Sequence, residues 1–87
     1  MDKELYLVIN RLMEEAKHIL DNEGLDKEKE VIEFVKTISF LAWSNADPED
    51  ECDFAFTTCT ITDFECEMID KITELHHIRL KEALNIG

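Results

Sequence analysis

The segment from Val31 to Trp43, VIEFVKTISFLAW, is apolar on more than one side, and it constrains the fold more than any other stretch. At about 100° per residue, its i, i+3, i+4, i+7 spacing places a core-facing stripe on one side of a helix. A second apolar group falls on nearly the opposite side and consists of Ile32, Phe40 and Trp43. We predict that this group is a hydrophobic interface, because exposed aromatic side chains make strong binding anchors. The alternative is that Trp43 closes one end of a monomeric core.

Composition indicates one small helical domain. The chain has 87 residues, of which 45% are apolar and 34% charged, and it contains one proline and two glycines. So few glycines and prolines are typical of helices rather than of a β-sandwich or barrel. The length is sufficient for one thin core, so we predict a single domain over residues 1–87.

Neither a targeting signal nor a membrane span is predicted. The chain begins MDKELYLVINRLMEEA, which is charged and periodic, unlike the basic start and apolar run of a signal peptide. No apolar run approaches the ~18 residues that a membrane span needs. The cysteines, Cys52, Cys59 and Cys66, lack the CxxC pairs of zinc sites and the even count of a disulfide framework. We therefore expect a soluble, cytoplasmic protein with reduced cysteines.

The predicted fold class is all-α, a small bundle of three to four antiparallel helices. Asp2 is a suitable N-cap for the first helix, and Gly24 can adopt the left-handed conformation that ends it. Asp26 would cap the second helix, and the short connection makes these two helices antiparallel. Asp47 and Pro48 have the form of a cap and a first helical position for the third helix. The predicted helices span about 3–22, 26–44, 48–58 and 63–84.

The last two predicted helices are either separate or continuous. The segment FAFTTCTIT is rich in β-branched and aromatic residues and would score as a strand by propensity. Helix is favoured nonetheless, because apolar residues keep helical phase across it. Thr62 and Glu65 have the form of a capping box, which predicts a break between Thr58 and Thr62. Without that break, the last helix would be about 55 Å long and would favour dimerisation.

Charge is the strongest functional signal in the sequence. The formal net charge is −12, and residues 47–70 hold nine carboxylates and no lysine or arginine. Such a field repels nucleic acid and attracts basic surfaces. We predict a partner-binding acidic surface made of Asp47, Glu49, Asp50, Glu51, Asp53, Asp63, Glu67 and Asp70. The alternative is a solvated face that only keeps the protein soluble.

Metal binding and catalysis are not predicted. Glu15 with His18, and Glu74 with His77, have the E-x-x-H form of a di-iron helical bundle. Both pairs project away from the apolar stripes of their helices, whereas metal ligands must face inward, so we predict no metal and no cofactor. The chain has no recognisable Ser/His/Asp set and no glycine-rich loop, and we predict that it is not an enzyme.

Two functions fit these features. The first is a small acidic binding or inhibitor protein that docks on a basic surface of a partner, such as the nucleic-acid groove of a nuclease or effector. Small phage proteins that block host nucleases, including anti-CRISPR and DNA-mimic inhibitors, are comparable in size and charge. The second is a homo-oligomeric structural or regulatory helical subunit that uses Ile32, Phe40 and Trp43, or the C-terminal stripe, as its interface. Neither function involves direct binding to nucleic acid or to a membrane.

Overall fold

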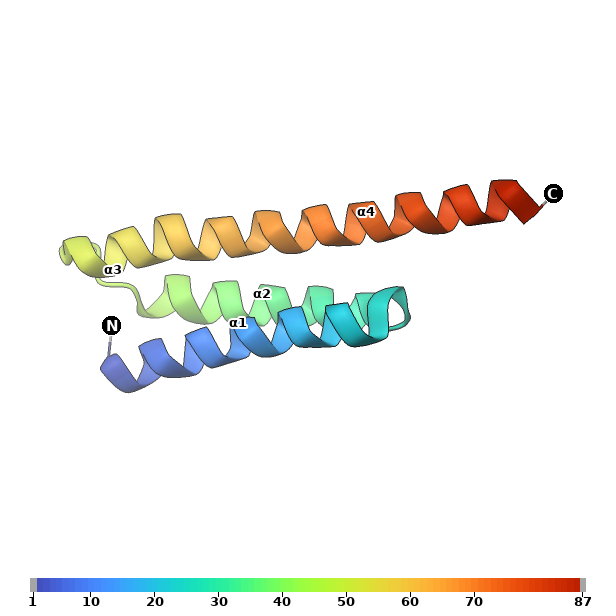
Figure 1. Cartoon of the computed structure of the whole chain (residues 1–87). Helices are drawn as coiled ribbons and strands as arrows, with labels where there is room; N and C mark the ends of the chain where they lie inside the picture. The colour runs from blue at the N-terminus through green and yellow to red at the C-terminus, as the bar shows by residue number, and fades with distance from the viewer. Residues whose placement is uncertain (1, 87) are drawn as a thin grey trace.

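The computed structural model describes residues 2–86, and within them it is helical with no strand (Figure 1). The predicted all-helical class is therefore confirmed. No helix in this part of the chain is long and apolar enough to cross a bilayer. The elements in order are α1 (Lys3–Glu23), the 3-10 turn η1 (Gly24–Lys27), α2 (Glu28–Asn45), α3 (Glu51–Ala55), the π-helix η2 (Phe56–Ile61) and α4 (Thr62–Ile86).

Helix α1 begins at the residue that the sequence predicts and ends at Glu23, one residue later than predicted. The Asp2 carboxylate accepts a hydrogen bond from the backbone N–H of Glu4 at 3.4 Å. Gly24 has a φ of 59°, in the left-handed region that favours glycine, and its N–H donates to the carbonyl of Leu20. The chain then makes one 3-10 turn, so α2 begins at Glu28. Asp26 lies inside that turn and does not cap α2, which moves the start of α2 later than predicted.

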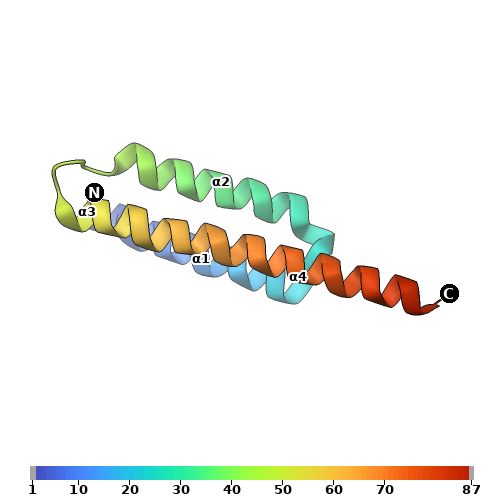
Figure 2. The same cartoon turned by 90° about the horizontal axis from the view of Figure 1, so that it is seen from above.

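Helices α1 and α2 lie antiparallel as a hairpin closed by η1 (Figure 2). The core-facing stripe predicted for α2 packs against an apolar face of α1 with the same helical spacing. The fully or nearly fully buried side chains of this contact are Ile9, Met13, Ala16 and Leu20 of α1 and Val31, Ile38 and Ala42 of α2. The core-facing stripe expected from Val31 is therefore confirmed.

The connection from α2 to α3 uses its aspartates differently from the prediction. The Asp47 carboxylate accepts from the N–H of Glu49 at 3.0 Å, so it stabilises the turn that precedes the helix. Asp50 is the N-cap instead, because its carboxylate accepts from the N–H of Cys52 at 2.9 Å. The helix consequently begins at Glu51 rather than at Pro48.

Helices α3 and α4 are joined by η2 into one continuous rod, and the break predicted between Thr58 and Thr62 is wrong (Figure 1). Thr57 is buried, and its hydroxyl donates to the backbone carbonyl of Asp53 at 2.8 Å. Such a bond competes with the regular backbone ladder, and β-branched residues are weak helix formers. A π-helix accommodates both effects by taking one extra residue per turn, so the rod changes phase without ending.

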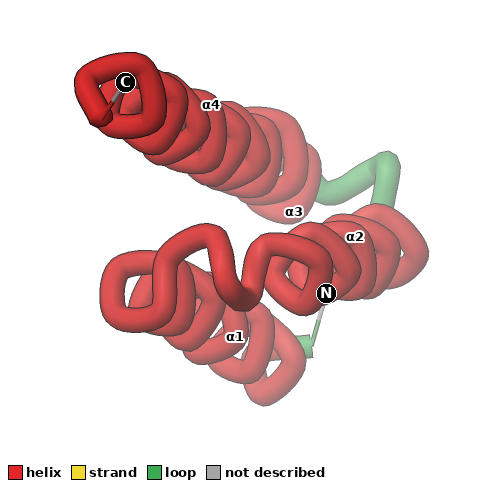
Figure 3. The backbone as a smooth tube through the Cα atoms, turned by 90° about the vertical axis from the view of Figure 1, so that its right-hand side faces the viewer, coloured by secondary structure: helices red, strands yellow, loops and turns green. Residues whose placement is uncertain are grey.

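Viewed end on, the rod packs over both helices of the hairpin and runs alongside them (Figure 3). Its 36 residues from Glu51 to Ile86 span about 54 Å at 1.5 Å per residue. The hairpin helices are shorter, so the C-terminal part of α4 projects past η1 (Figures 1 and 2). The rod contributes Phe56, Ile61, Phe64 and Met68 to the common core.

Candidate partner-binding surfaces

Four of the predicted acidic residues lie together at one end of the molecule, in the connection from α2 to α3 and at the first residue of α3. We call Asp47, Glu49, Asp50 and Glu51 the turn acids, and all four are exposed. The carboxylates of Asp47 and Asp50 each accept a hydrogen bond from a backbone N–H. Glu49 and Glu51 make no ion pair within residues 2–86. This end of the molecule is therefore strongly negative and free to attract positive charge.

Asp53 does not belong to that exposed surface. Its side chain is only 4% exposed, and one carboxylate oxygen lies 3.4 Å from the N–H of Asp47. The residue sits in the first turn of α3 on the face that packs inward, so it stabilises the connection. The prediction that Asp53 contacts a partner is corrected accordingly.

The remaining three predicted acids form a stripe on α4. Asp63, Glu67 and Asp70 are spaced i, i+4, i+7, which places them on one face of the helix, and all are exposed. Glu67 lies 3.2 Å from the Lys17 ammonium, whereas Asp63 and Asp70 have no ion pair in the described chain. We call these three residues the α4 acidic stripe.

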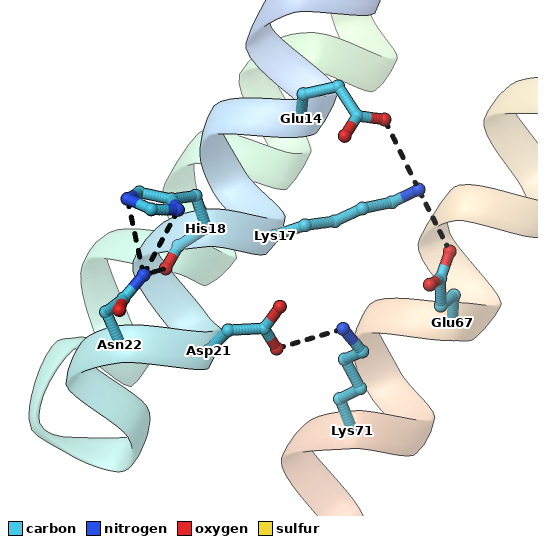
Figure 4. Close-up of polar contacts among 7 residues, drawn as sticks. All are labelled: Glu14, Lys17, His18, Asp21, Asn22, Glu67 and Lys71. Carbon is cyan, nitrogen blue, oxygen red and sulfur yellow. Dashed lines mark hydrogen bonds and ion pairs between the residues drawn. The ribbon is translucent and has the colours of Figure 1, made fainter.

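Two ion pairs connect α1 to α4 where these helices lie side by side (Figure 4). The Lys17 ammonium reaches Glu67 of α4 and lies 3.8 Å from Glu14 of its own helix. One turn further on, the Lys71 ammonium lies 3.0 Å from the carboxylate of Asp21. Partly exposed pairs of this kind contribute about 0–1 kcal/mol each, so they add little to the stability of the fold.

The histidines face solvent or a carboxylate, and their arrangement differs from a metal centre. His18 lies beside Asn22 on its own helix, with the Asn22 amide 3.1 Å from Nδ1 and 2.8 Å from the His18 carbonyl (Figure 4). His76 lies 2.8 Å from Glu28 and links α4 to α2. Among the described residues, no group of three or more His, Cys, Asp or Glu side chains is placed to hold a metal ion.

The three residues of the predicted hydrophobic interface are not equally accessible. Phe40 is 72% exposed and Trp43 is 49% exposed, whereas Ile32 is half-buried in a groove. Trp43 also lines a separate hollow with Phe54, which is 57% exposed. The sequence reasoning missed Phe54, because its position fits the helical phase of the core stripe.

The groove that contains Ile32 runs between α2 and α4 and has a volume of about 380 Å³. Glu65 is half-buried in it, and its carboxylate has neither an ion pair nor a hydrogen bond to any described residue. Ile69 is 61% exposed at the groove and was missed because it lies outside the predicted core stripe. The signal in the sequence that could have identified Ile69 is that it does not share the helical phase of the apolar residues predicted to face the core. The groove is lined by Ile32, Val35, Lys36, Ser39, Glu65, Met68, Ile69 and Ile72.

Comparison of the chain with protein-family models, curated proteins and solved structures found no match. The charge and shape of these surfaces are therefore the basis for assigning a function.

Proposed function

We propose that this protein is a small acidic binding protein, acting as an inhibitor, that docks on a basic surface of a partner protein. The carrying observation is that Glu49 and Glu51 of the turn acids, and Asp63 and Asp70 of the α4 acidic stripe, are exposed without a cationic partner in residues 2–86. Unpaired carboxylates on one side of an association attract a positive surface and accelerate docking. No enzymatic step is part of the proposal.

The partner that best fits is a nucleic-acid-binding nuclease or effector. Its groove is built to neutralise rows of phosphates with lysine and arginine, and rows of carboxylates can take the same places. This is the chemistry of a DNA mimic or a phage-type anti-defence protein such as an anti-CRISPR. Such a partner would place the action of the protein in the cytoplasm.

The scaffold supports this use of the charge. In the proposal, the chain acts as a small bundle of three to four antiparallel helices, with α3, η2 and α4 behaving as one rod. The turn acids precede and begin that rod, and the α4 acidic stripe continues along it. Asp63 and Asp70 are separated by a rise of about 10.5 Å along a helix. Carboxylates held on a rigid rod lose little conformational entropy on binding.

The test is binding to a panel of purified nucleases and CRISPR effectors, measured at low and high salt and with duplex DNA as competitor. We expect at least one member to bind, with an affinity that falls with salt and with displacement by DNA. The triple variant Glu49→Lys, Glu51→Lys and Asp63→Lys should weaken binding by at least about tenfold, because each reversal converts an attraction into a repulsion.

A matched control changes the net charge by the same amount elsewhere. Glu15, Glu23 and Glu82 are exposed and make no ion pair within residues 2–86, so Lys at all three should leave binding much stronger than in the first triple variant. Equal losses in the two variants would show that only net charge matters. Failure of every panel member to bind, or binding that DNA does not displace, would overturn the proposal.

A further inference from the structure

The hollow beside the turn acids is lined by aromatic side chains from two helices. Trp43 of α2 is 49% exposed, and Phe54 of α3 is 57% exposed. The hollow has a volume of about 310 Å³, and its other lining residues are Ala46, Asp47, Pro48 and Thr57. Large aromatic side chains that meet in an open hollow are good anchors for a partner, because they bring much contact area at little entropic cost.

The two rings are not used by the chain itself. Neither Trp43 nor Phe54 stacks on another ring or lies beneath a cation within residues 2–86. The indole N–H of Trp43 likewise donates no hydrogen bond to a described residue. An occupant of the hollow could therefore stack on these rings without displacing an interaction of the fold.

Negative charge accompanies the rings. Asp47 lines the hollow, and only one of its carboxylate oxygens accepts the Glu49 N–H, so the other has no partner in the described chain. Glu51 lies one turn before Phe54 on α3, and residues three apart are neighbours on a helix surface. Residues 47–70 contain no lysine or arginine. The hollow thus combines aromatic faces with carboxylates, and the surrounding segment has no cation to fill it.

An arginine side chain fits this combination better than a lysine or an apolar side chain. The guanidinium is planar, so it can stack on an aromatic face while its N–H groups bind a carboxylate. A lysine ammonium is a compact, strongly hydrated charge without this planar geometry. An apolar side chain would withdraw the Asp47 carboxylate from water without giving it a partner, which is costly.

We propose that the hollow between Trp43 and Phe54 binds an arginine side chain of the basic partner protein. The guanidinium lies between the two rings and pairs with the Asp47 carboxylate, while the other turn acids attract the basic surface around it. This role for the hollow rests on the proposed function, since it names the side chain by which the partner is held. Arginine is a frequent ligand of phosphate groups, so a phosphate-binding groove can supply it.

The test uses two capped pentapeptides, KKRKK and KKKKK, which carry equal charge and differ in one residue. Trp43 is the only tryptophan in the chain, so its fluorescence and its single indole N–H resonance report binding at the hollow. At low salt, we expect KKRKK to shift both signals. We also expect KKRKK to bind the full chain at least about threefold more tightly than KKKKK, because its guanidinium stacks on the rings.

Phe54→Leu keeps an apolar side chain and removes one ring. It should remove most of the preference for KKRKK and leave the binding of KKKKK nearly unchanged, since both peptides keep the same charge attraction. Phe40→Leu is the matched control, because Phe40 is 72% exposed on α2 and does not line the hollow, and it should retain the preference. Asp47→Asn, which can still accept the Glu49 N–H, should lower the preference by removing the charge that pairs with the guanidinium.

The proposal is overturned by equal binding of the two peptides to the wild type, or by an indole resonance that KKRKK does not shift. A preference that survives Phe54→Leu, or that Phe40→Leu reduces as much, would also overturn it. The peptide test fails separately from the proposed function. A nuclease or effector that binds the chain while the peptides are not distinguished would remove only the arginine site. A clear preference for KKRKK without binding to any member of the nuclease panel would retain the arginine site and overturn the inhibitor function.

Discussion

The Tyr6 ring of α1 lies against the Phe56 ring of η2, with the ring centroids 3.8 Å apart and the planes at 39°. Phe56 is 5% exposed, and Tyr6 is half-buried. The contact fastens the start of the hairpin to the rod where the rod changes from α-helix to π-helix.

Removing one ring of this pair should be strongly destabilising. We expect Phe56→Ala to lower the free energy of unfolding by about 3–5 kcal/mol, because it deletes a buried aromatic side chain and leaves a cavity. Urea denaturation followed by circular dichroism measures the loss. Phe54→Ala is the control, since Phe54 is 57% exposed, and it should cost far less. Equal losses for the two variants would contradict the burial of Phe56.

The pKa of Tyr6 should lie above its ordinary value. Burial and, to a smaller extent, the negative charge of Cys52 raise the pKa of Tyr6 above 10.0. The folded state thus keeps the phenol protonated at a pH where the unfolded state releases the proton. This contribution to stability is complete below pH 10 and is lost as the pH rises through the folded-state pKa.

Absorbance at alkaline pH measures this titration directly, because Tyr6 is the only tyrosine in the chain. Cys52→Ser should lower the pKa of Tyr6 slightly, since it removes the smaller of the two causes. A pKa of Tyr6 at or below 10.0 in the folded wild type would contradict the burial of its hydroxyl group.

Ser39→Ala should stabilise the protein. The Ser39 hydroxyl is buried and has no hydrogen-bond partner among the described residues, and a buried unpaired hydroxyl costs about 1–3 kcal/mol. Alanine is also the better helix former. We expect a gain of about 1 kcal/mol in thermal or urea denaturation. Thr57→Val, which deletes a hydroxyl bonded to the Asp53 carbonyl, should move stability in the opposite direction.

The ion pair between Lys71 and Asp21 should contribute little despite its distance of 3.0 Å. A double-mutant cycle with Lys71→Met and Asp21→Asn should give a coupling of about 0.2–1 kcal/mol, because both side chains are partly exposed. Added salt should reduce this coupling. A coupling well above 1 kcal/mol that salt does not affect would mean that the pair is shielded from water.

Local patterns in the sequence were enough to predict several features of the fold. Helical periodicity predicted α1 and α2, and the cap at Asp2 and the left-handed Gly24 are confirmed. These features depend on residues within one or two turns of each other, so the sequence contains all that decides them. Local patterns could not distinguish between two suitable N-cap residues. Asp47 and Asp50 are both good caps, and the sequence predicted Asp47 whereas the structure uses Asp50.

The candidate surfaces depended on both the sequence and the tertiary structure. Net charge and its concentration in residues 47–70 follow from the sequence alone, because charge is a sum over residues. Packing alone decided that Asp53 is buried, that Phe54 is exposed and that Ile69 borders a groove. The π-helix changes the phase of the rod between α3 and α4, and the hairpin covers only part of its circumference. A periodicity count assumes one constant phase and cannot see which side of a helix its neighbours cover, so only the tertiary structure could place these three side chains.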